Sequence, residues 1–149
     1  MAGTFSWLES MAACEVPNTL FEKQTKLQTT QNMFLRTYNL TGAITQAMLR
    51  NSIGTLTDIR GMFQHCNLTS IASGFLNLGS VNKKLTYMWT AFYSNDNLEG
   101  SAPAFWNKAL FTNIQESQAG YWGAFYGTNI TNKEQAEAVS ANWTVQQTT

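Results

Sequence analysis

Charged residues are scarce in this sequence, and they are balanced: nine Lys and Arg stand against nine Asp and Glu in 149 residues. A surface without net charge gives no electrostatic footprint for nucleic acid or for an anionic membrane. Long hydrophobic runs are also missing, so no segment is expected to span a bilayer. We therefore expect neither nucleic acid nor a membrane among the partners of the chain.

Residues that carry out chemistry are equally scarce. The single histidine, His65, precedes Cys66, but neighbouring residues of a turn point in different directions, so we expect no pair of nucleophile and base. The ligand spacings of a zinc site are missing, as are a phosphate-binding loop and a dinucleotide fingerprint. Asp96 and Glu99 fall in one turn, which is more typical of a solvated loop than of a catalytic carboxylate pair. The sequence predicts a protein without enzymatic activity, cofactor or metal.

What the sequence does contain is a repeat built on phenylalanine. Phe34, Phe63 and Phe92 are 29 residues apart, Phe125 follows after 33, and each comes a few residues before an Asn-Leu or Asn-Ile pair. A fixed period of this length is typical of a solenoid, in which each repeat buries its apolar face against its neighbours. The residues one and four positions before each Phe are mostly apolar and would share a face of a helical turn with it. We expect these side chains to form the core.

Each repeat is expected to contain a short strand, a helical turn through the Phe, and a second short strand at the Asn-Leu-Thr segment. Residues 56–59 and 85–88 have the apolar ends and the Thr content of brief strands. The predicted fold class is therefore an α/β repeat, a solenoid of about four to five coils with short parallel strands and short helical turns.

The whole chain is expected to form one solenoid domain, residues 1–149. Met11 takes the Phe position in an early half repeat, and a capping box from Thr131 to Glu134 predicts the start of a C-terminal helix. The predicted divisions are an N-terminal helix and half repeat at 1–25, the repeats at 26–130, and a C-terminal helix and closing strand at 131–149.

The two cysteines are expected to remain unpaired. Cys14 and Cys66 are assigned to equivalent positions two coils apart, which would place their backbones about 10 Å from each other at the ordinary strand spacing. A disulfide needs Cα atoms within about 7 Å. We predict two free, buried thiols and no disulfide.

The repeat resembles that of the bacterial BspA-like leucine-rich-repeat family. The closest copy is MFQHCNLTSI, from Met62 to Ile71, and the segment from Val16 to Phe21 is similar to the part of the family pattern that contains proline. The likeness covers residues 11–145. It implies a leucine-rich-repeat solenoid that serves adhesion or recognition, on bacterial surfaces or on the virions of phages that infect such bacteria, and it implies no chemistry.

Aromatic residues near the C-terminal end exceed what a core requires, because eleven of the nineteen fall between residues 85 and 126. Trp89 and Trp122 lie three positions before a repeat Phe, and Tyr93 and Tyr126 lie one position after it. These positions are four residues apart, so we expect the four side chains to form one exposed patch. The patch is interpreted as a protein contact, including self-association, as a surface that stacks on a polysaccharide, or as core covered by the C-terminal helix.

Two classes of function fit these features. The first is a non-enzymatic structural or recognition module of a phage virion, a decoration or fibre protein on the virion surface that docks on a protein partner or on copies of itself. The alternative is an adhesin-type domain that binds a ligand or glycan, at the bacterial cell surface or secreted. The first residues have neither the basic stretch nor the apolar core of a signal peptide, which favours the virion if Met1 is the natural start.

Overall fold

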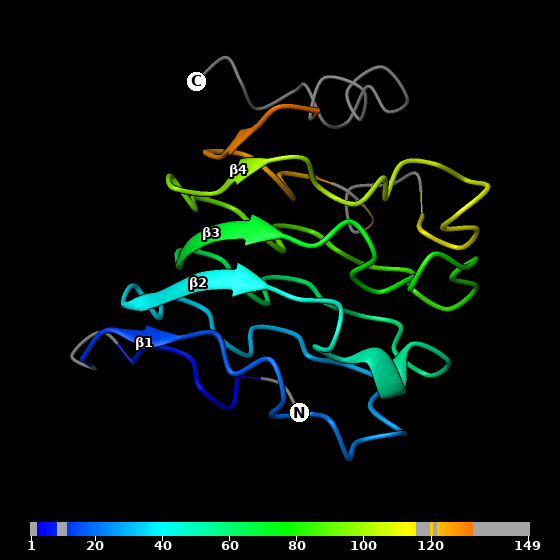
Figure 1. The fold of residues 1–149 in the computed structure, drawn as a ribbon, viewed down its shortest axis with the longest axis horizontal. Helices are drawn as coiled ribbons and strands as arrows, with labels where there is room; N and C mark the ends of the chain where they lie inside the picture. The colour runs from blue at the N-terminus through cyan, green and yellow to red at the C-terminus, as the bar shows by residue number, and fades with distance from the viewer. Residues whose placement is uncertain (1–2, 9–11, 116–119, 121, 133–149) are drawn as a thin grey trace.

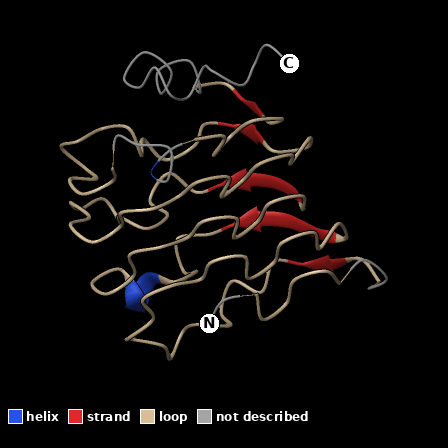
Figure 2. Cartoon of the chain, turned by 180° about the vertical axis from the view of Figure 1, so that it is seen from behind, coloured by secondary structure: helices blue, strands red, loops and turns tan. Residues whose placement is uncertain are grey.

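The computed structural model describes residues 3–8, 12–115, 120 and 122–132, and its repeats lie in layers from the N-terminal to the C-terminal end (Figure 1). Its strands are all short and pair in parallel, in one sheet of order β1-β2-β3 and a second sheet of β4 and β5. A 3-10 helix, η1 (Arg50–Ser52), lies among the loops on the side opposite the strands (Figure 2). The strands are β1 (Cys14–Glu15), β2 (Leu40–Ile44), β3 (Asn67–Ile71), β4 (Glu99–Gly100) and β5 (Asn129–Ile130).

The predicted α/β leucine-rich-repeat solenoid is wrong. The elements bounded within the described residues include no α-helix, and their strands form two small sheets rather than one sheet through every repeat. The segments 56–59 and 85–88, predicted as strands, contribute only isolated bridges that join Thr29 to Asp58 and Asp58 to Tyr87. The described part of the chain therefore consists mainly of stacked turns and loops, without solenoid closure.

The helical turn through each Phe is replaced by a chain of tight turns. The residues two positions before and two positions after each repeat Phe have left-handed backbones, with φ between 51° and 66°. A right-handed helix requires negative φ, so it cannot pass through these positions. Counting Phe5, 29 residues before Phe34, as a further copy, the residues concerned are Gly3, Trp7, Asn32, Arg36, Gly61, His65, Thr90, Ser94, Gly123 and Gly127.

Backbone hydrogen bonds between successive repeats hold these turns in place. Around Phe34, the N–H groups of Asn32, Phe34 and Arg36 donate to carbonyls of the next repeat at 2.8, 2.9 and 2.8 Å. The N–H groups at the same three positions, two before the Phe, at the Phe and two after it, donate in the same way around Phe63 and Phe92. Left-handed residues other than glycine are strained by about 1–2 kcal/mol each, and we attribute their tolerance here to these inter-repeat bonds.

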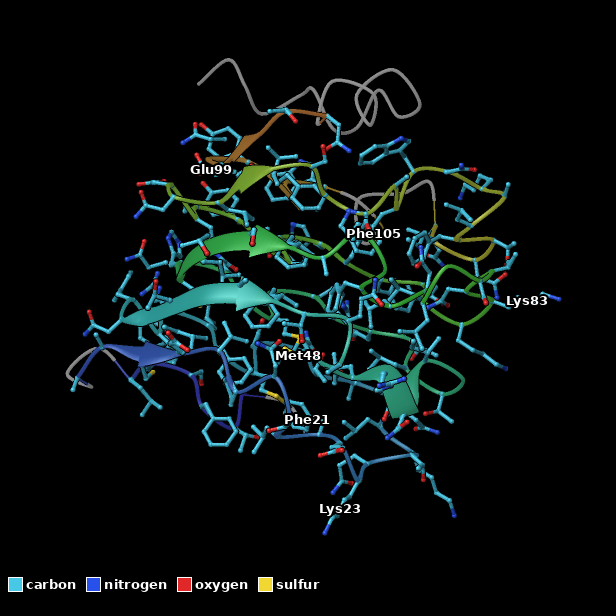
Figure 3. All side chains as sticks on the ribbon, in the orientation of Figure 1. Phe21, Lys23, Met48, Lys83, Glu99 and Phe105 are labelled. Atoms are coloured by element: carbon cyan, nitrogen blue, oxygen red, sulfur yellow. The ribbon has the colours of Figure 1, made fainter. Side chains whose placement is uncertain are left out.

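Stacked phenylalanine rings form the centre of the core. Neighbouring rings from Phe5 to Phe125 have centroids between 5.1 and 5.8 Å apart and are nearly parallel. The assignment of the first Phe position to Met11 is wrong, because Phe5, 29 residues before Phe34, occupies it. Figure 3 shows Met48 and Phe105 inside the molecule and Lys23 and Lys83 at its periphery.

The helix predicted at the N-terminal end is wrong, whereas the one predicted at the C-terminal end falls outside the described residues. The described residues of 1–25 form turns and β1 rather than a helix, and Trp7 has a left-handed backbone. The C-terminal helix and closing strand predicted from the capping box lie outside the described residues, apart from Thr131 and Asn132.

A buried side chain three residues after Phe34, Phe63 and Phe92 connects the layers. The Thr37 hydroxyl donates to the Phe5 carbonyl at 2.8 Å, the Cys66 thiol to the Phe34 carbonyl at 3.1 Å, and the Asn95 amide to the Phe63 carbonyl at 2.8 Å. Each side chain therefore donates a hydrogen bond to a carbonyl of the preceding layer, and so contributes to satisfying the buried backbone.

The two cysteines differ in burial. Both thiols are free, but Cys66 is buried in the position just described, whereas Cys14 lies in β1 opposite Leu40 and is half-buried. The prediction of two buried thiols is thus wrong for Cys14. The Asn-Leu pairs of successive repeats are also not aligned with each other in the sheet, because Asn67 pairs with Thr41 rather than with Asn39.

Candidate binding groove

The four aromatic residues singled out from the sequence lie as two contacting pairs. The Trp89 and Trp122 rings are 5.7 Å apart and tilted by 56°, and the Tyr93 and Tyr126 rings are 5.1 Å apart and nearly parallel at 16°. Trp89 is 38% exposed, and the other three are half-buried. The tilt leaves part of the Trp89 face uncovered, whereas the stacked tyrosines cover each other's faces.

Trp89, Tyr93 and Trp122 line a groove of about 560 Å³ that crosses five repeats, from that of Phe5 to that of Phe125. This volume lies within the range of about 300–1,000 Å³ that is common for ligand pockets. The groove begins at Trp7, which is 55% exposed, and ends at Trp122. Tyr126 is not part of the lining and supports Tyr93 from behind.

Residues of the left-handed turns contribute to the groove. Asn32, Gly61 and Thr90, each two positions before a Phe, are among its lining residues. A Cβ atom at Gly61 would clash with the side-chain oxygen of Asn32. A larger residue at Gly61 would therefore displace the Asn32 side chain, and its positive φ of 58° also favours glycine.

One of the two groove arginines forms a bidentate pair with a carboxylate. The Arg60 guanidinium donates to Asp58 through Nε at 3.0 Å and through Nη2 at 2.7 Å, and it lies 5.0 Å from the centre of the Tyr87 ring. The hydrogen bond to Asp58 raises the pKa of Arg60 above its ordinary value. Because Asp58 is buried, this bidentate pair fixes the orientation of Arg60.

The other arginine, Arg36, contacts an aromatic ring instead. Its guanidinium carbon lies 4.2 Å from the centre of the Trp7 ring. Among the described residues the one ion pair is that of Arg60 with Asp58, so Arg36 has no carboxylate partner there. A cation over an aromatic face keeps its hydrogen-bond donors largely available.

His65 lies at the rim of the groove between two tyrosines. Its ring is 6.2 Å from that of Tyr38 and 5.4 Å from that of Tyr93. Burial lowers the pKa of His65, the charge of Arg36 lowers it further, and Asp96 opposes both effects. His65 is therefore a half-buried packing residue rather than the solvated turn residue that its position in the sequence suggests.

Sequence reasoning did not find Trp7, Arg36 or His65 as groove residues. All three lie two positions after a repeat Phe, but Trp7 joins this set only when Phe5 is recognised as the first copy. The signal was present in the spacing of 29 residues between Phe5 and Phe34.

The groove offers stacking and hydrogen bonding.

A separate polar pocket of about 350 Å³ is lined by His65, Ser94 and Asp96, among other residues. No hydrogen bond joins His65 to Ser94 or to Asp96 there, so the three side chains do not form a catalytic arrangement. Within the described ranges, no group of three His, Cys, Asp or Glu side chains is placed to hold a metal. Within the same ranges, no helix has the length and apolar character needed to cross a membrane.

Comparisons of the chain with protein-family models, with curated proteins and with solved structures found no match. The resemblance to BspA-like repeats therefore remains a prediction from sequence.

Proposed function

We propose that the chain is a non-enzymatic recognition module that binds a glycan through the groove, displayed on a virion or on a bacterial cell surface. The observation that carries this proposal is the partly exposed face of Trp89 in a groove whose lining combines aromatic rings with amide and guanidinium groups. Aromatic faces bind the apolar side of a sugar ring, while amide and guanidinium groups bind its hydroxyls.

The lining favours a saccharide over a peptide in this groove. An amphipathic peptide helix binds by laying its apolar anchors into a hydrophobic groove. Leu35 is the single Leu, Ile, Val or Met side chain among the described lining residues, and Gln31, Asn32 and Gln64 supply amide groups. Flat rings beside hydrogen-bonding amides match the alternation of apolar face and polar rim in a sugar.

The test is retention on immobilised polysaccharides, neutral and acidic, for the wild type and for Trp89→Ser. Loss of a stacking residue should weaken retention about tenfold, since such contacts contribute roughly 1–2 kcal/mol. Val81→Ser, which alters an exposed apolar residue outside the groove, is the matched control and should be retained like the wild type. Absence of retention of the wild type on every polysaccharide, or equal retention of Trp89→Ser, would overturn the proposal.

A second candidate function, docking on a protein partner as a virion decoration or fibre protein, is favoured by the N-terminal end. An apolar pocket of about 280 Å³ lies there, lined by residues that include Phe5, Leu8, Pro17 and the exposed Leu20. It adjoins β1, which is the edge strand of its sheet. Exposed apolar surface beside an open strand edge is typical of a protein contact.

The oligomeric mass tests this candidate in its simplest form, self-association. If the apolar end is an interface between copies, Leu20→Asp should shift the native mass to that of the monomer, whereas Leu78→Asp, at another exposed leucine, should not. A wild-type chain that is monomeric at all concentrations in analytical ultracentrifugation would exclude the self-associating form.

A further inference from the structure

The charges along the groove are of one sign. Arg36 and Arg60 both line it, and neither an aspartate nor a glutamate is among the described lining residues. Asp58 neutralises Arg60 from outside the lining, so the net charge of the groove is the positive charge of Arg36, in a chain that has no net charge as a whole. Cationic grooves with low-dielectric walls concentrate anionic ligands.

Arg36 is the cation that remains available to a ligand. Asp58 engages two nitrogens of Arg60, whereas the described part of the chain gives Arg36 no carboxylate. The Arg36 backbone is fixed by its N–H bond to the Gln64 carbonyl at 2.8 Å, and its guanidinium rests on Trp7. A planar guanidinium held in this way is preorganised for bidentate binding of a carboxylate.

Neighbouring groups add neutral donors. The Gln64 side-chain oxygen accepts the Thr90 hydroxyl at 3.1 Å, so its amide nitrogen is left to donate elsewhere. Gln31, from the adjacent repeat, lines the same groove with a second amide. Hydroxyls next to a carboxylate would find donors here.

We propose that the glycan bound by the groove is an acidic oligosaccharide, with a carboxylate bound by Arg36 and a sugar ring against Trp89. This inference rests on the proposed function. Arg36 and Trp89 lie two repeats apart, which is at least about 10 Å at the ordinary strand spacing. A ligand that contacts both must therefore be longer than a single sugar.

The experiment measures binding of polygalacturonate oligosaccharides and of the same oligosaccharides after reduction of their carboxyl groups to alcohols. Wild type, Arg36→Gln and Arg36→Lys are compared by isothermal titration calorimetry at fixed salt. Arg50→Gln is the matched control, because it removes an equal charge from an exposed position in η1, outside the groove. Urea unfolding of each variant verifies that it is folded.

For the acidic oligosaccharide, Arg36→Gln should weaken binding about tenfold or more. Arg36→Lys should weaken it less, because an ammonium keeps the positive charge but cannot form the two parallel hydrogen bonds that a guanidinium forms with a carboxylate. Arg50→Gln should bind like the wild type. Reduction of the carboxyl groups should weaken wild-type binding by a similar factor and remove the difference between wild type and Arg36→Gln.

Three results would overturn the inference. If the reduced oligosaccharide binds the wild type as well as the acidic one, and Trp89→Ser still weakens both, the proposed function stands and the acidic ligand is refuted. Equal competition by poly-glutamate would mean that the groove recognises an acidic chain rather than a saccharide. If neither of these oligosaccharides nor any other polysaccharide binds, the proposed function itself fails.

Discussion

Replacing Asn95 by Leu removes an amide that joins two layers of the stack. Asn95 is fully buried, and its side-chain nitrogen donates to the carbonyls of Phe63 at 2.8 Å and Phe92 at 2.9 Å. Its side-chain oxygen accepts the Leu68 N–H at 3.2 Å. Leucine has a similar volume but can form none of these bonds, so the substitution isolates their contribution from the effect of a cavity.

The expected loss follows from the three backbone groups left behind. A buried donor or acceptor without a partner costs about 1–3 kcal/mol, so the free energy of unfolding should fall by about 3–5 kcal/mol if relaxation recovers part of the sum. A domain of this size is typically stable by about 5–15 kcal/mol. The variant should therefore be folded but close to the limit of stability.

Urea unfolding monitored by tryptophan fluorescence measures this loss. Asn95→Thr should lose less than Asn95→Leu, because Thr37 fills the same position in another repeat with its hydroxyl bonded to the preceding layer. Asn97→Leu, two residues away and exposed, should change the free energy of unfolding by no more than about 0.5 kcal/mol. A loss below about 1 kcal/mol for Asn95→Leu would refute the view that this amide holds the layers together.

Three further predictions concern the core and the titrating groups. Phe63→Ala, which removes a fully buried ring stacked on two others, should lower the free energy of unfolding by about 3–5 kcal/mol; equal urea midpoints for this variant and the exposed Leu78→Ala would contradict the ring stack. Iodoacetamide should modify Cys14 in the native protein and Cys66 only after unfolding, because burial raises the pKa of Cys66 to about 12; equal rates by mass spectrometry would show that Cys66 is accessible. Because the pKa of His65 is lowered by folding, the unfolded chain takes up the proton first, so stability should fall as pH drops below about 6.5, and more for the wild type than for His65→Gln; parallel pH profiles of the two proteins would exclude this linkage.

The spacing of the phenylalanines was enough to predict which side chains stack. Phe34, Phe63, Phe92 and Phe125 recur because each layer buries the same apolar position against the next, and periodicity reports that burial directly. The spacing could not reveal the backbone between them. A turn with residues of alternating handedness and a helical turn both bring every third or fourth residue to a common side, so the sequence pattern fits either.

The left-handed positions illustrate why the helix prediction failed. Gly61 and Gly123, two positions before a Phe, are residues that favour positive φ, but Arg36 and His65, two positions after a Phe, carry no such signal. Their conformation is imposed by hydrogen bonds to the next layer, which exist only after the layers have stacked. Local preference is outweighed there by long-range pairing.

The sequence by itself determined the repeat, the stacked rings of the core, and the two rows that contain Trp89, Trp122, Tyr93 and Tyr126. Only the tertiary structure decided that these rows border a groove, that Trp7 closes its other end, and that Arg60 is engaged by Asp58 while Arg36 is not. The physical reason is that burial leaves a periodic trace along the chain, whereas the pairing of charges depends on distances between layers, which the spacing of residues does not contain.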